Sequence, residues 1–503
     1  MESHPPNRSI IAEPQRPRWL ASLGALSVLL GSLVALRYAD AGLTLAHYDA
    51  KAHLVVARRI IDSLTPGWIQ IGAVWLPLPH LISMLPVQWD VCYRTGAFGV
   101  GLSVLAFGVI IAMLAALVLG ITRSRTAALA AALAAGLNPN LLYLQATPMT
   151  EPLLLALTVS ATWLGITALR SGDRRDLRRA GLAFAAAVLT RYEAWPVTGA
   201  FLAMGVLSLV RQGSGVRQAL VITGRLALYP AAGVLAFLLL SRATVGEWFV
   251  SSGFFVADNP AMHLPWRALV SVWWGLHELS SYPLAILGAA GLLLLGIRAL
   301  WSPRLAPWLP ALAMAAAAAL PWMAFNSGHP FRIRYMVPLI PVMALGVGCA
   351  VGLAGRLKPV MAAVALAALA LQVHPLDPSA PIVLEAQWDR ANRAGRARVA
   401  AYLRSHWNGE PIMASMGSLA HFMQELSSDG YRIRDFLHEG NGDIWLAALE
   451  YPDLHAEWML IEEQAEGGDM LAAIARTRPR FLAGYERVAE GGGVALYRRK
   501  EPT

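Results

Sequence analysis

The sequence predicts a polytopic α-helical membrane protein that carries a soluble α/β domain at its C-terminal end. Of the 503 residues, 56% are hydrophobic and only 15% are charged, whereas soluble domains average about 25% charged residues. Apolar runs of roughly 15–25 residues fill positions 18–373, and such runs can cross a hydrocarbon core about 30 Å thick. These runs are continuously apolar rather than alternating, which favours helices over a β-barrel.

We expect about eleven transmembrane helices from these apolar runs. Their expected positions are 18–37, 95–121, 126–145, 152–169, 180–193, 195–210, 218–241, 281–299, 306–325, 335–355 and 359–373. The first run ends near Arg37 without a small-residue cleavage site, so we interpret it as a retained signal anchor. The fifth and sixth runs share one apolar stretch, which is interrupted at residues 191–196.

Basic residues are concentrated in alternate loops between the expected spans. They are Arg16 and Arg18, Arg123 and Arg125, the segment RSGDRRDLRR at 170–179, Arg211 and Arg217, Arg298 and Arg304, and Arg356 and Lys358. The positive-inside rule predicts that these loops and the N-terminus are cytoplasmic. The expected exoplasmic segments are then 38–94, 146–151, 191–196, 242–280, 326–334 and the region after 373. We therefore interpret the net charge of +9 as a topology signal and expect no nucleic-acid partner.

Two domains are expected, a transmembrane domain at 1–373 and a soluble exoplasmic domain at 374–503, which holds most of the acidic residues. The first exoplasmic loop, 38–94, is rich in Trp, Gly and Pro and is expected to hold two interfacial helices. These helices are expected around 50–63 and 76–87. The soluble domain is expected to contain a helix at 388–406, a strand at 411–417, a helix at 418–427, a strand at 457–462, and a hairpin at 481–499 that turns at Gly491–Gly493.

Two carboxylates lie at the expected exoplasmic edge of the membrane. Asp49 stands at the start of a helix, where it can cap the helix or act as a general base facing a cavity. Asp40 is a less favoured alternative for that base. Glu151 opens the fourth span, where Pro152 and the helix dipole also account for an acid. Because Asp49 and Glu151 lie at the same expected depth, we expect a shared site.

Charged residues also interrupt two later apolar stretches on the same side. Arg191 and Glu193 precede a proline, and residues two apart do not face each other on a helix. We therefore expect them to contact another span or to hold a phosphate or a sugar hydroxyl. His329, Arg332 and Arg334 follow at the outer end of the tenth span. They either snorkel to the membrane interface or bind an anionic ligand through guanidinium forks.

The sequence contains no clear metal motif. His47, His53 and His80 lie in the first loop and could ligate a metal, but their spacing specifies no site, and ordinary hydrogen bonding is the alternative. Cys92 and Cys349 form neither a metal motif nor an expected disulfide. The residues therefore do not require a cofactor, and binding of a divalent metal ion remains an alternative.

These segments together resemble the GT-C membrane glycosyltransferases, a superfamily that includes protein O-mannosyltransferases and the lipid A aminoarabinose transferase. The resemblance rests on the segments YDAKAHLVVARRI, TPMTEP, TRYEAWP and RIRYMVPLIP, together with a short cytoplasmic N-terminus and an exoplasmic C-terminal domain. It implies that Asp49 is catalytic, that Glu151 is a second acidic site residue, and that Arg332 and Arg334 hold a lipid phosphate. The other expected substrate-binding residues are His53, Arg191, Glu193 and Tyr335 in these segments and His329, which lies three residues before the last of them. The first-loop motif has one Asp followed by Ala-Lys, not the acidic pair of some members, which puts metal dependence in doubt.

The resemblance implies an inverting hexosyltransferase of the inner (plasma) membrane that acts on the exoplasmic face. A sugar linked to a polyprenyl phosphate would be the donor, and a hydroxyl of a lipid, glycan or protein would be the acceptor. Asp49 would deprotonate that hydroxyl, and the arginines would neutralise the departing phosphate. The lipid tail of the donor would remain among the spans, so membrane lipids are further expected partners.

Two other functions are compatible with buried ionisable groups in a membrane protein. A secondary transporter would use them as a binding site, but the sequence lacks repeat symmetry and gathers its charges on one face. A glycan polymerase or ligase that uses a lipid-diphosphate donor would need the same kind of site, with acids and arginines on the exoplasmic face.

Overall fold

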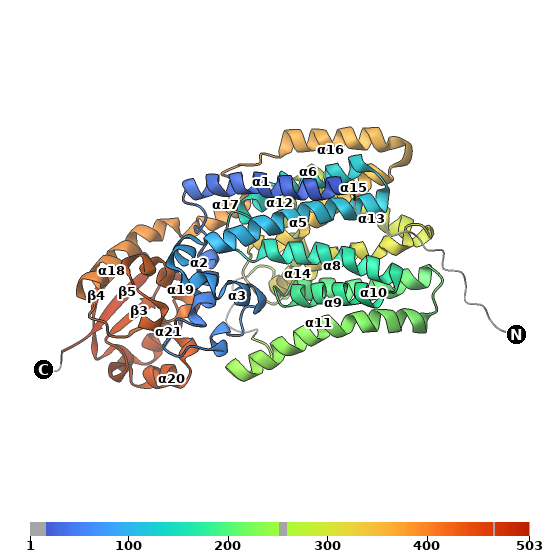
Figure 1. Ribbon diagram of the computed structural model, residues 1–503. Helices are drawn as coiled ribbons and strands as arrows, with labels where there is room; N and C mark the ends of the chain where they lie inside the picture. Colours follow the sequence, from blue (N-terminus) through green and yellow to red (C-terminus); the bar gives the residue numbers. More distant parts are fainter. Residues whose placement is uncertain (1–16, 251–258, 466–467, 502–503) are drawn as a thin grey trace.

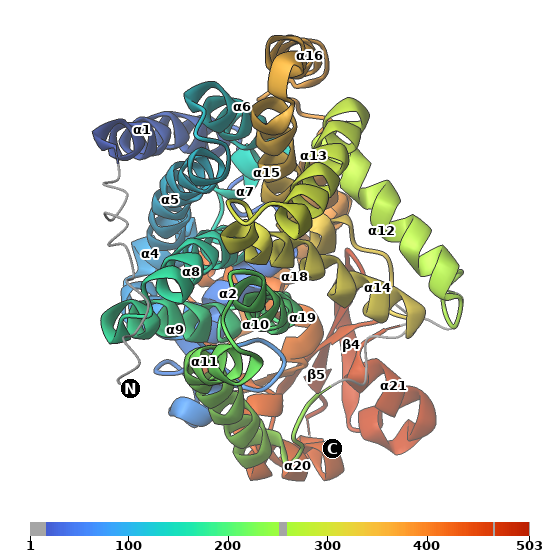
Figure 2. The ribbon, with the colours of Figure 1, turned by 90° about the vertical axis from the view of Figure 1, so that its right-hand side faces the viewer.

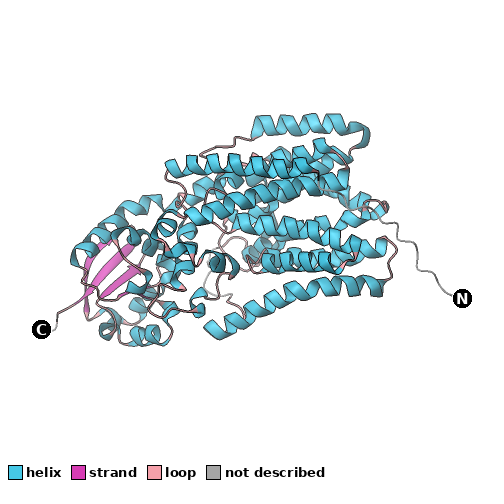
Figure 3. Ribbon diagram, in the orientation of Figure 1, coloured by secondary structure: helices cyan, strands magenta, loops and turns pink. Residues whose placement is uncertain are grey.

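The computed structural model describes residues 17–250, 259–465 and 468–501. A bundle of long helices carries a smaller domain at one end, and the strands lie in that smaller domain (Figures 1 and 3). Arg16 and residues 251–258 lie outside the described residues. Arg16 was one of the basic residues used to predict the orientation, and residues 251–258 belong to the expected exoplasmic segment 242–280.

The bundle is built from helices of very different lengths. Its α-helices are α1 (Arg18–Asp40), α5 (Ala97–Thr122), α6 (Arg125–Gly136), α7 (Pro139–Leu144), α8 (Glu151–Ser171), α9 (Arg174–Val188), α10 (Ala194–Arg211), α11 (Val216–Val245), α12 (Pro265–Ser280), α13 (Tyr282–Trp301), α14 (Ala319–Asn326), α15 (Ile340–Leu353) and α16 (Lys358–Gln372). Its 3₁₀ segments are η3 (Ala306–Ala318), η4 (Ile333–Leu339) and η5 (Gly355–Leu357). Together they form a multi-pass membrane protein.

Among the described residues, 9 helical segments are long and apolar enough to cross a membrane. The two other expected spans, 126–145 and 180–193, fall on shorter helices. Asn138 divides the first of them, because its side chain accepts hydrogen bonds from Asn140 N at 3.0 Å and Leu141 N at 3.1 Å and so caps a new helix, α7. The second is α9, a helix of 15 residues whose first turn is charged.

The bundle is most enclosed around α15. The segment Ile333–Leu353 is largely buried, whereas α1 and α16 expose most of their apolar surface at the edge of the bundle (Figure 2). A β-carbon on Gly346 of α15 would lie 2.0 Å from the carbonyl oxygen of Gly288 of α13, so glycine at this position lets the two backbones meet.

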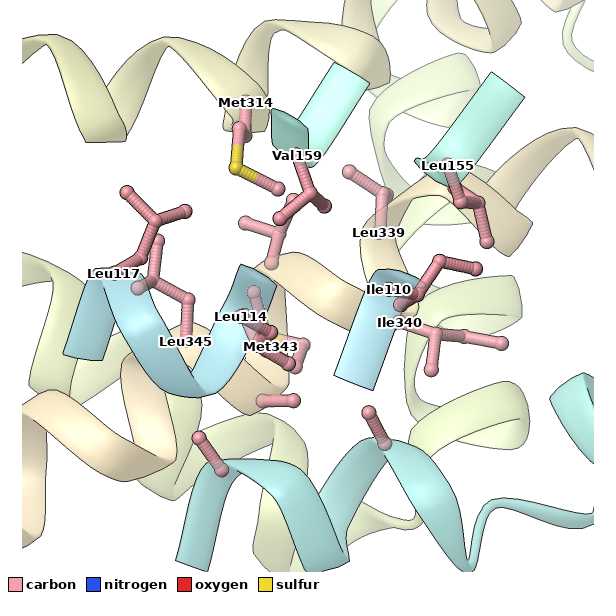
Figure 4. Close-up of a cluster of buried hydrophobic side chains, with 14 of the residues drawn as sticks. Ile110, Leu114, Leu117, Leu155, Val159, Met314, Leu339, Ile340, Met343 and Leu345 are labelled. Atoms are coloured by element: carbon pink, nitrogen blue, oxygen red, sulfur yellow. The ribbon is translucent and has the colours of Figure 1, made fainter. Parts of the chain in front are cut away.

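Leucine and other large apolar side chains fill the space around α15. Figure 4 shows the cluster, to which α5 contributes Ile110, Leu114 and Leu117, α8 contributes Leu155 and Val159, η3 contributes Met314, and η4 and α15 contribute Leu339, Ile340, Met343 and Leu345. Burial of this cluster fixes α15 and therefore the start of η4, which carries Arg334.

The first loop folds into short helices that lie between the bundle and the smaller domain (Figure 1). They are α2 (Tyr48–Arg59), η1 (Trp68–Ile71), α3 (Leu78–Ser83), η2 (Pro86–Gln88) and α4 (Asp90–Thr95). We expected α2 to lie on the membrane surface, but the residues from Asp49 to Arg58 are all buried. The smaller domain covers α2, so apolar and charged faces are both enclosed, and the interfacial prediction for this helix is wrong.

The smaller domain is an α/β domain, as the sequence predicts. Its helices are α17 (Pro381–Ala386), η6 (Trp388–Asn392), α18 (Arg393–His406), α19 (Met416–Leu426), η7 (Ser427–Asp429), η8 (Ile433–Asp435), η9 (Glu439–Asn441), α20 (Asp443–Glu450), η10 (Pro452–Leu454), α21 (Met470–Thr477) and η12 (Pro479–Leu482). Its strands are β1 (Ile412–Ala414), β2 (Phe436–Leu437), β3 (Trp458–Glu462), β4 (Tyr485–Gly491) and β5 (Val494–Arg499).

The strands form one sheet in the order β2-β1-β3-β5-β4. The pairs β1–β2 and β1–β3 are parallel, and β3–β5 and β4–β5 are antiparallel. The hairpin of β4 and β5 turns at Gly492 and Gly493, whose φ angles of 62° and 84° favour glycine. Strand β2 was not predicted from the sequence, because it has only two residues.

A buried ionic network joins α2 to the smaller domain. The carboxylate of Glu425 in α19 accepts a hydrogen bond from Lys51 of α2. It also accepts two hydrogen bonds from Arg396 of α18, and both of these are 3.1 Å long. Arg396 also donates to both oxygens of Asp389, at 2.9 and 2.6 Å. Burial raises the pKa of Glu425, but the hydrogen bonds from Arg396 and the charge of Lys51 outweigh it and lower the pKa to about 2.

We predict that Glu425→Gln destabilises the docking of α2 on the smaller domain. The folded-state pKa of Glu425 lies below its unfolded value, so its contribution is present above about pH 4.5 and is lost as the pH falls toward 2. The melting temperature in detergent should drop by several degrees at pH 7. The difference from the wild type should shrink below pH 4.5. Glu410→Gln, at an exposed position, is the matched control, and an equal effect of both changes would contradict the prediction.

Candidate active site

Four carboxylates and two guanidinium groups meet at the end of the bundle that faces the smaller domain. Asp49 comes from α2, Glu151 from the first turn of α8, and Arg334 from η4. Arg191 and Glu193 come from the turn between α9 and α10, and Glu385 comes from α17. The exposed side-chain fractions are 7% for Asp49, 0% for Glu151, 3% for Glu193 and 9% for Arg334. These charges are therefore removed from bulk water and must be balanced by one another.

Arg334 is the centre of this cluster. It forms a close ion pair with Asp49, and its guanidinium lies 4.0 Å from Glu151 Oε1 and 3.9 Å from Glu385 Oε1. Arg334 lies in a 3₁₀ segment that begins after the extended Arg332, at φ −133°. One cation thus links the first loop, the fourth expected span and the smaller domain.

Arg191 balances two further carboxylates. Its guanidinium lies 3.2 Å from Glu151 Oε1 and 2.8 Å from Glu193 Oε1, and it donates to Thr150 Oγ1 at 3.0 Å. Arg191 and Glu193 can pair although they are two residues apart, because they lie in a turn and not within a regular helix. The rule that such residues do not face each other applies only to helices.

His47 and Glu385 connect Asp49 to the smaller domain. The backbone N–H of Asp49 donates to His47 Nδ1 at 3.1 Å, so the proton of neutral His47 is on Nε2, which lies 3.6 Å from Glu385 Oε1. Glu385 also accepts from Ile333 N at 3.0 Å. Burial raises the pKa of Glu385, but its interaction with the nearby His47 and the charge of Arg334 outweigh burial, and the pKa is lowered. His47, and not Asp49, is the N-cap of α2.

Glu385 is the cluster member that the sequence analysis missed. It follows the last expected span in PIVLEAQW, a segment that we assigned to the soluble domain. A single acid in a short apolar helix next to the membrane could have drawn attention to it. Its partners lie far away in the chain, so no local pattern pointed to its role.

The other predicted site residues lie around the cluster. Tyr335 lies beside Arg334, whose guanidinium carbon is 5.7 Å from the centre of its ring. The Tyr335 hydroxyl is 3.5 Å from Nε2 of His329. Arg332 lies over the ring of Trp388, 4.6 Å from its centre, and so borders the smaller domain. Arg332 and Arg334 therefore have different surroundings, which their spacing alone did not indicate.

The described part of the chain contains no candidate metal site. There, no three side chains of His, Cys, Asp or Glu are grouped so that they could hold a metal ion. The carboxylates of the cluster face arginines instead, and His53 lies next to His80, with Nδ1 and Nε2 3.1 Å apart.

We predict that Arg191→Met strongly destabilises the folded protein, because it leaves Glu151 and Glu193 buried without their shared cation. Breaking a buried ion pair from one side costs about 3–5 kcal/mol. The combined change Arg191→Met, Glu151→Gln and Glu193→Gln should recover much of that loss, since no uncompensated charge is left. Thermal unfolding in detergent measures both effects.

Arg179→Met is the matched control for this prediction, because its side chain is 69% exposed. Its melting temperature should equal that of the wild type. An unchanged melting temperature of Arg191→Met would show that the cluster does not need its cation.

Comparisons with known proteins identify the fold. No protein-family model matches the chain, and no curated protein sequence matches it significantly. Among solved structures, ArnT from Cupriavidus metallidurans bound to undecaprenyl phosphate is similar over 95% of this chain and 99% of that chain, with a TM-score of 0.52 and 14% identity. The apo state of the same protein is similar over 96% and 100%, with a TM-score of 0.52 and 14% identity. The chain therefore has the membrane-protein fold of ArnT, as the resemblance of its sequence segments implied.

Proposed function

We propose that the protein is an inverting membrane glycosyltransferase that moves a sugar from a polyprenyl-phosphate donor to an acceptor hydroxyl. The reaction takes place on the exoplasmic face of the inner membrane, where the smaller domain lies. The observation that carries the proposal is the buried pairing of Asp49 with Arg334 at one end of a membrane bundle. The fold supports it, since a solved structure with this fold holds undecaprenyl phosphate.

Asp49 and Arg334 have complementary chemistry for this reaction. A carboxylate can take the proton of the attacking hydroxyl as the anomeric bond breaks through an oxocarbenium-like state. A guanidinium can neutralise the negative charge that grows on the departing phosphate. Both groups are nearly removed from water, which strengthens each interaction.

The ion pair between these residues gives the reaction an order. Arg334 engages Asp49 in a buried ion pair. The donor phosphate competes with Asp49 for the guanidinium, because both are anions. Binding of the donor phosphate to Arg334 would thus free Asp49 to face the acceptor hydroxyl.

The surrounding charges hold these two residues in place. Glu151 lies within ion-pair distance of both Arg191 and Arg334, so it holds Arg191 in a fixed position relative to Arg334. Arg332 is held over Trp388 at the border with the smaller domain. From that position its charge acts on Tyr335, beside Arg334, and we assign it a supporting role toward the donor phosphate.

The proposal is tested by incubating the purified protein with a panel of polyprenyl-phosphate sugars that includes mannose and aminoarabinose. Cell-envelope lipids and glycans serve as acceptors, and release of polyprenyl phosphate is measured. We expect release with at least one donor. Release only from lipid-diphosphate donors would instead support a polymerase or ligase, and no release from any donor would contradict the proposal.

We predict that Asp49→Asn abolishes transfer and leaves the protein folded. Loss of the general base should reduce kcat by about 10²–10⁴-fold. Asp40→Asn is the matched control, because Asp40 lies at an exposed position at the end of α1. Steady-state kinetics and a thermal melt are compared for both variants. Full activity of Asp49→Asn would refute its role as the base.

Replacement of both Arg332 and Arg334 by Ala should weaken use of the donor. Arg334→Ala alone should lower kcat and raise the KM for the donor, together by on the order of a hundredfold in kcat/KM, because it removes a charge-assisted contact to the leaving group. Arg332→Ala should mainly raise the donor KM. Arg267→Ala, at an exposed position of α12, is the control. An unchanged dependence on donor concentration in the double variant would count against the phosphate assignment.

A further inference from the structure

Two buried histidines lie next to each other in the first loop, and one of them is on the same helix as Asp49. His53 is in α2 and His80 is in α3, and their exposed fractions are 6% and 1%. His53 comes four residues after Asp49, so the two side chains are on the same face of α2. The positive charges of Arg191 and Arg334 act on His53. This histidine therefore belongs to the surroundings of the cluster and not to the outer surface of the loop.

Hydrogen bonds determine which nitrogen of each ring carries a proton. His80 Nδ1 lies 3.1 Å from the carbonyl oxygen of Leu76, and a carbonyl oxygen can only accept. His80 Nδ1 is therefore the donor, and Nε2 of neutral His80 is an acceptor. His53 Nδ1 lies 3.1 Å from that Nε2, so His53 donates through Nδ1. The remaining nitrogen, His53 Nε2, then carries a lone pair and no proton.

Both rings are held in the neutral state that this chain of hydrogen bonds requires. Burial, together with the charge of Arg59, lowers the pKa of His80 to about 3. Burial also lowers the pKa of His53, and His80, Arg191, Arg334 and His47 lower it further. Neither histidine is therefore protonated near neutral pH, and His53 Nε2 remains an acceptor.

His53 Nε2 is a buried acceptor that nothing in the described residues satisfies. It is enclosed by the protein and has no hydrogen-bond partner there. Trp75 lies against the ring, with centroids 4.2 Å apart, and holds its orientation. A buried polar atom without a partner costs about 1–3 kcal/mol, so a ligand that donates a hydrogen bond to it gains that interaction on binding.

We propose that His53 Nε2 accepts a hydrogen bond from a hydroxyl of the sugar donor or of the acceptor, and that His80 holds the ring in the tautomer that makes this possible. This inference rests on the proposed glycosyl transfer. A phosphate oxygen has only lone pairs to offer at neutral pH, so it is disfavoured next to this nitrogen, whereas the arginines attract it. His53 and Arg334 together orient the substrate, with hydroxyl toward α2 and phosphate toward η4.

The experiment combines nitrogen NMR of the purified protein, labelled with ¹⁵N-histidine, with the kinetics of three variants. His53 signals are assigned by comparison with His53→Gln. We expect an unprotonated Nε2 whose shift is constant from pH 5 to 8. Its shift should change on addition of a sugar-bearing polyprenyl phosphate from the panel above, but not on addition of undecaprenyl phosphate. A response to the acceptor alone would assign the hydroxyl to the acceptor instead.

The kinetic arm compares His53→Phe, which cannot accept a hydrogen bond, with His53→Gln, whose amide oxygen can. His53→Phe should lower kcat/KM on the order of tenfold or more, and His53→Gln should restore much of it. His406→Phe, at an exposed position of α18, is the control. His80→Phe should let protonated Nε2 appear in the spectrum of His53.

The possible failures are distinguishable. A protonated or titrating Nε2, or a shift that no sugar-bearing lipid and no acceptor alters, would overturn this inference even if transfer occurs. Full activity of His53→Phe would do the same. Absence of transfer with every donor would overturn the proposed function, while the tautomer measured without substrate would still report on the histidine pair.

Discussion

The ion pair between Asp49 and Arg334 is the constraint on which the rest of the site depends. The carboxylate and the guanidinium are enclosed at the end of a membrane bundle and compensate each other, and Glu151 and Glu385 lie within 4.0 Å of the same guanidinium. The pair joins the first loop to η4, two segments that are far apart in the chain.

Three parts of the fold keep this pair in position. Packing of α15 against α13 and α5 fixes the segment that carries Arg334. The network of Lys51, Glu425 and Arg396 fixes α2, which carries Asp49, against the smaller domain. Glu385 then links that domain directly to both sides, through His47 and Ile333. The smaller domain is therefore a part of the site and not an appendage to the bundle.

Much of the fold could be predicted from the sequence, because hydropathy and hairpin signals are local. The long apolar helices and the hairpin of β4 and β5 appear where those signals placed them. The predictions diverged where tertiary contacts override a local pattern. The amphipathic character of α2 suggested a membrane surface, yet its second face packs on α19. The apolar run 126–145 contains a helix cap at Asn138, which the hydropathy of the run does not reveal.

The sequence by itself determined the membrane class of the protein, the order of its domains and the residue types available to the site. Asp49, Glu151, Arg191, Glu193 and Arg334 were all candidates because charged residues at a membrane edge are costly unless they are paired. Only the tertiary structure decided which acid faces which arginine, brought Glu385 into the cluster, and set the tautomer of His53 through His80. Those relations depend on distances between segments remote in the chain, and no local periodicity encodes such distances.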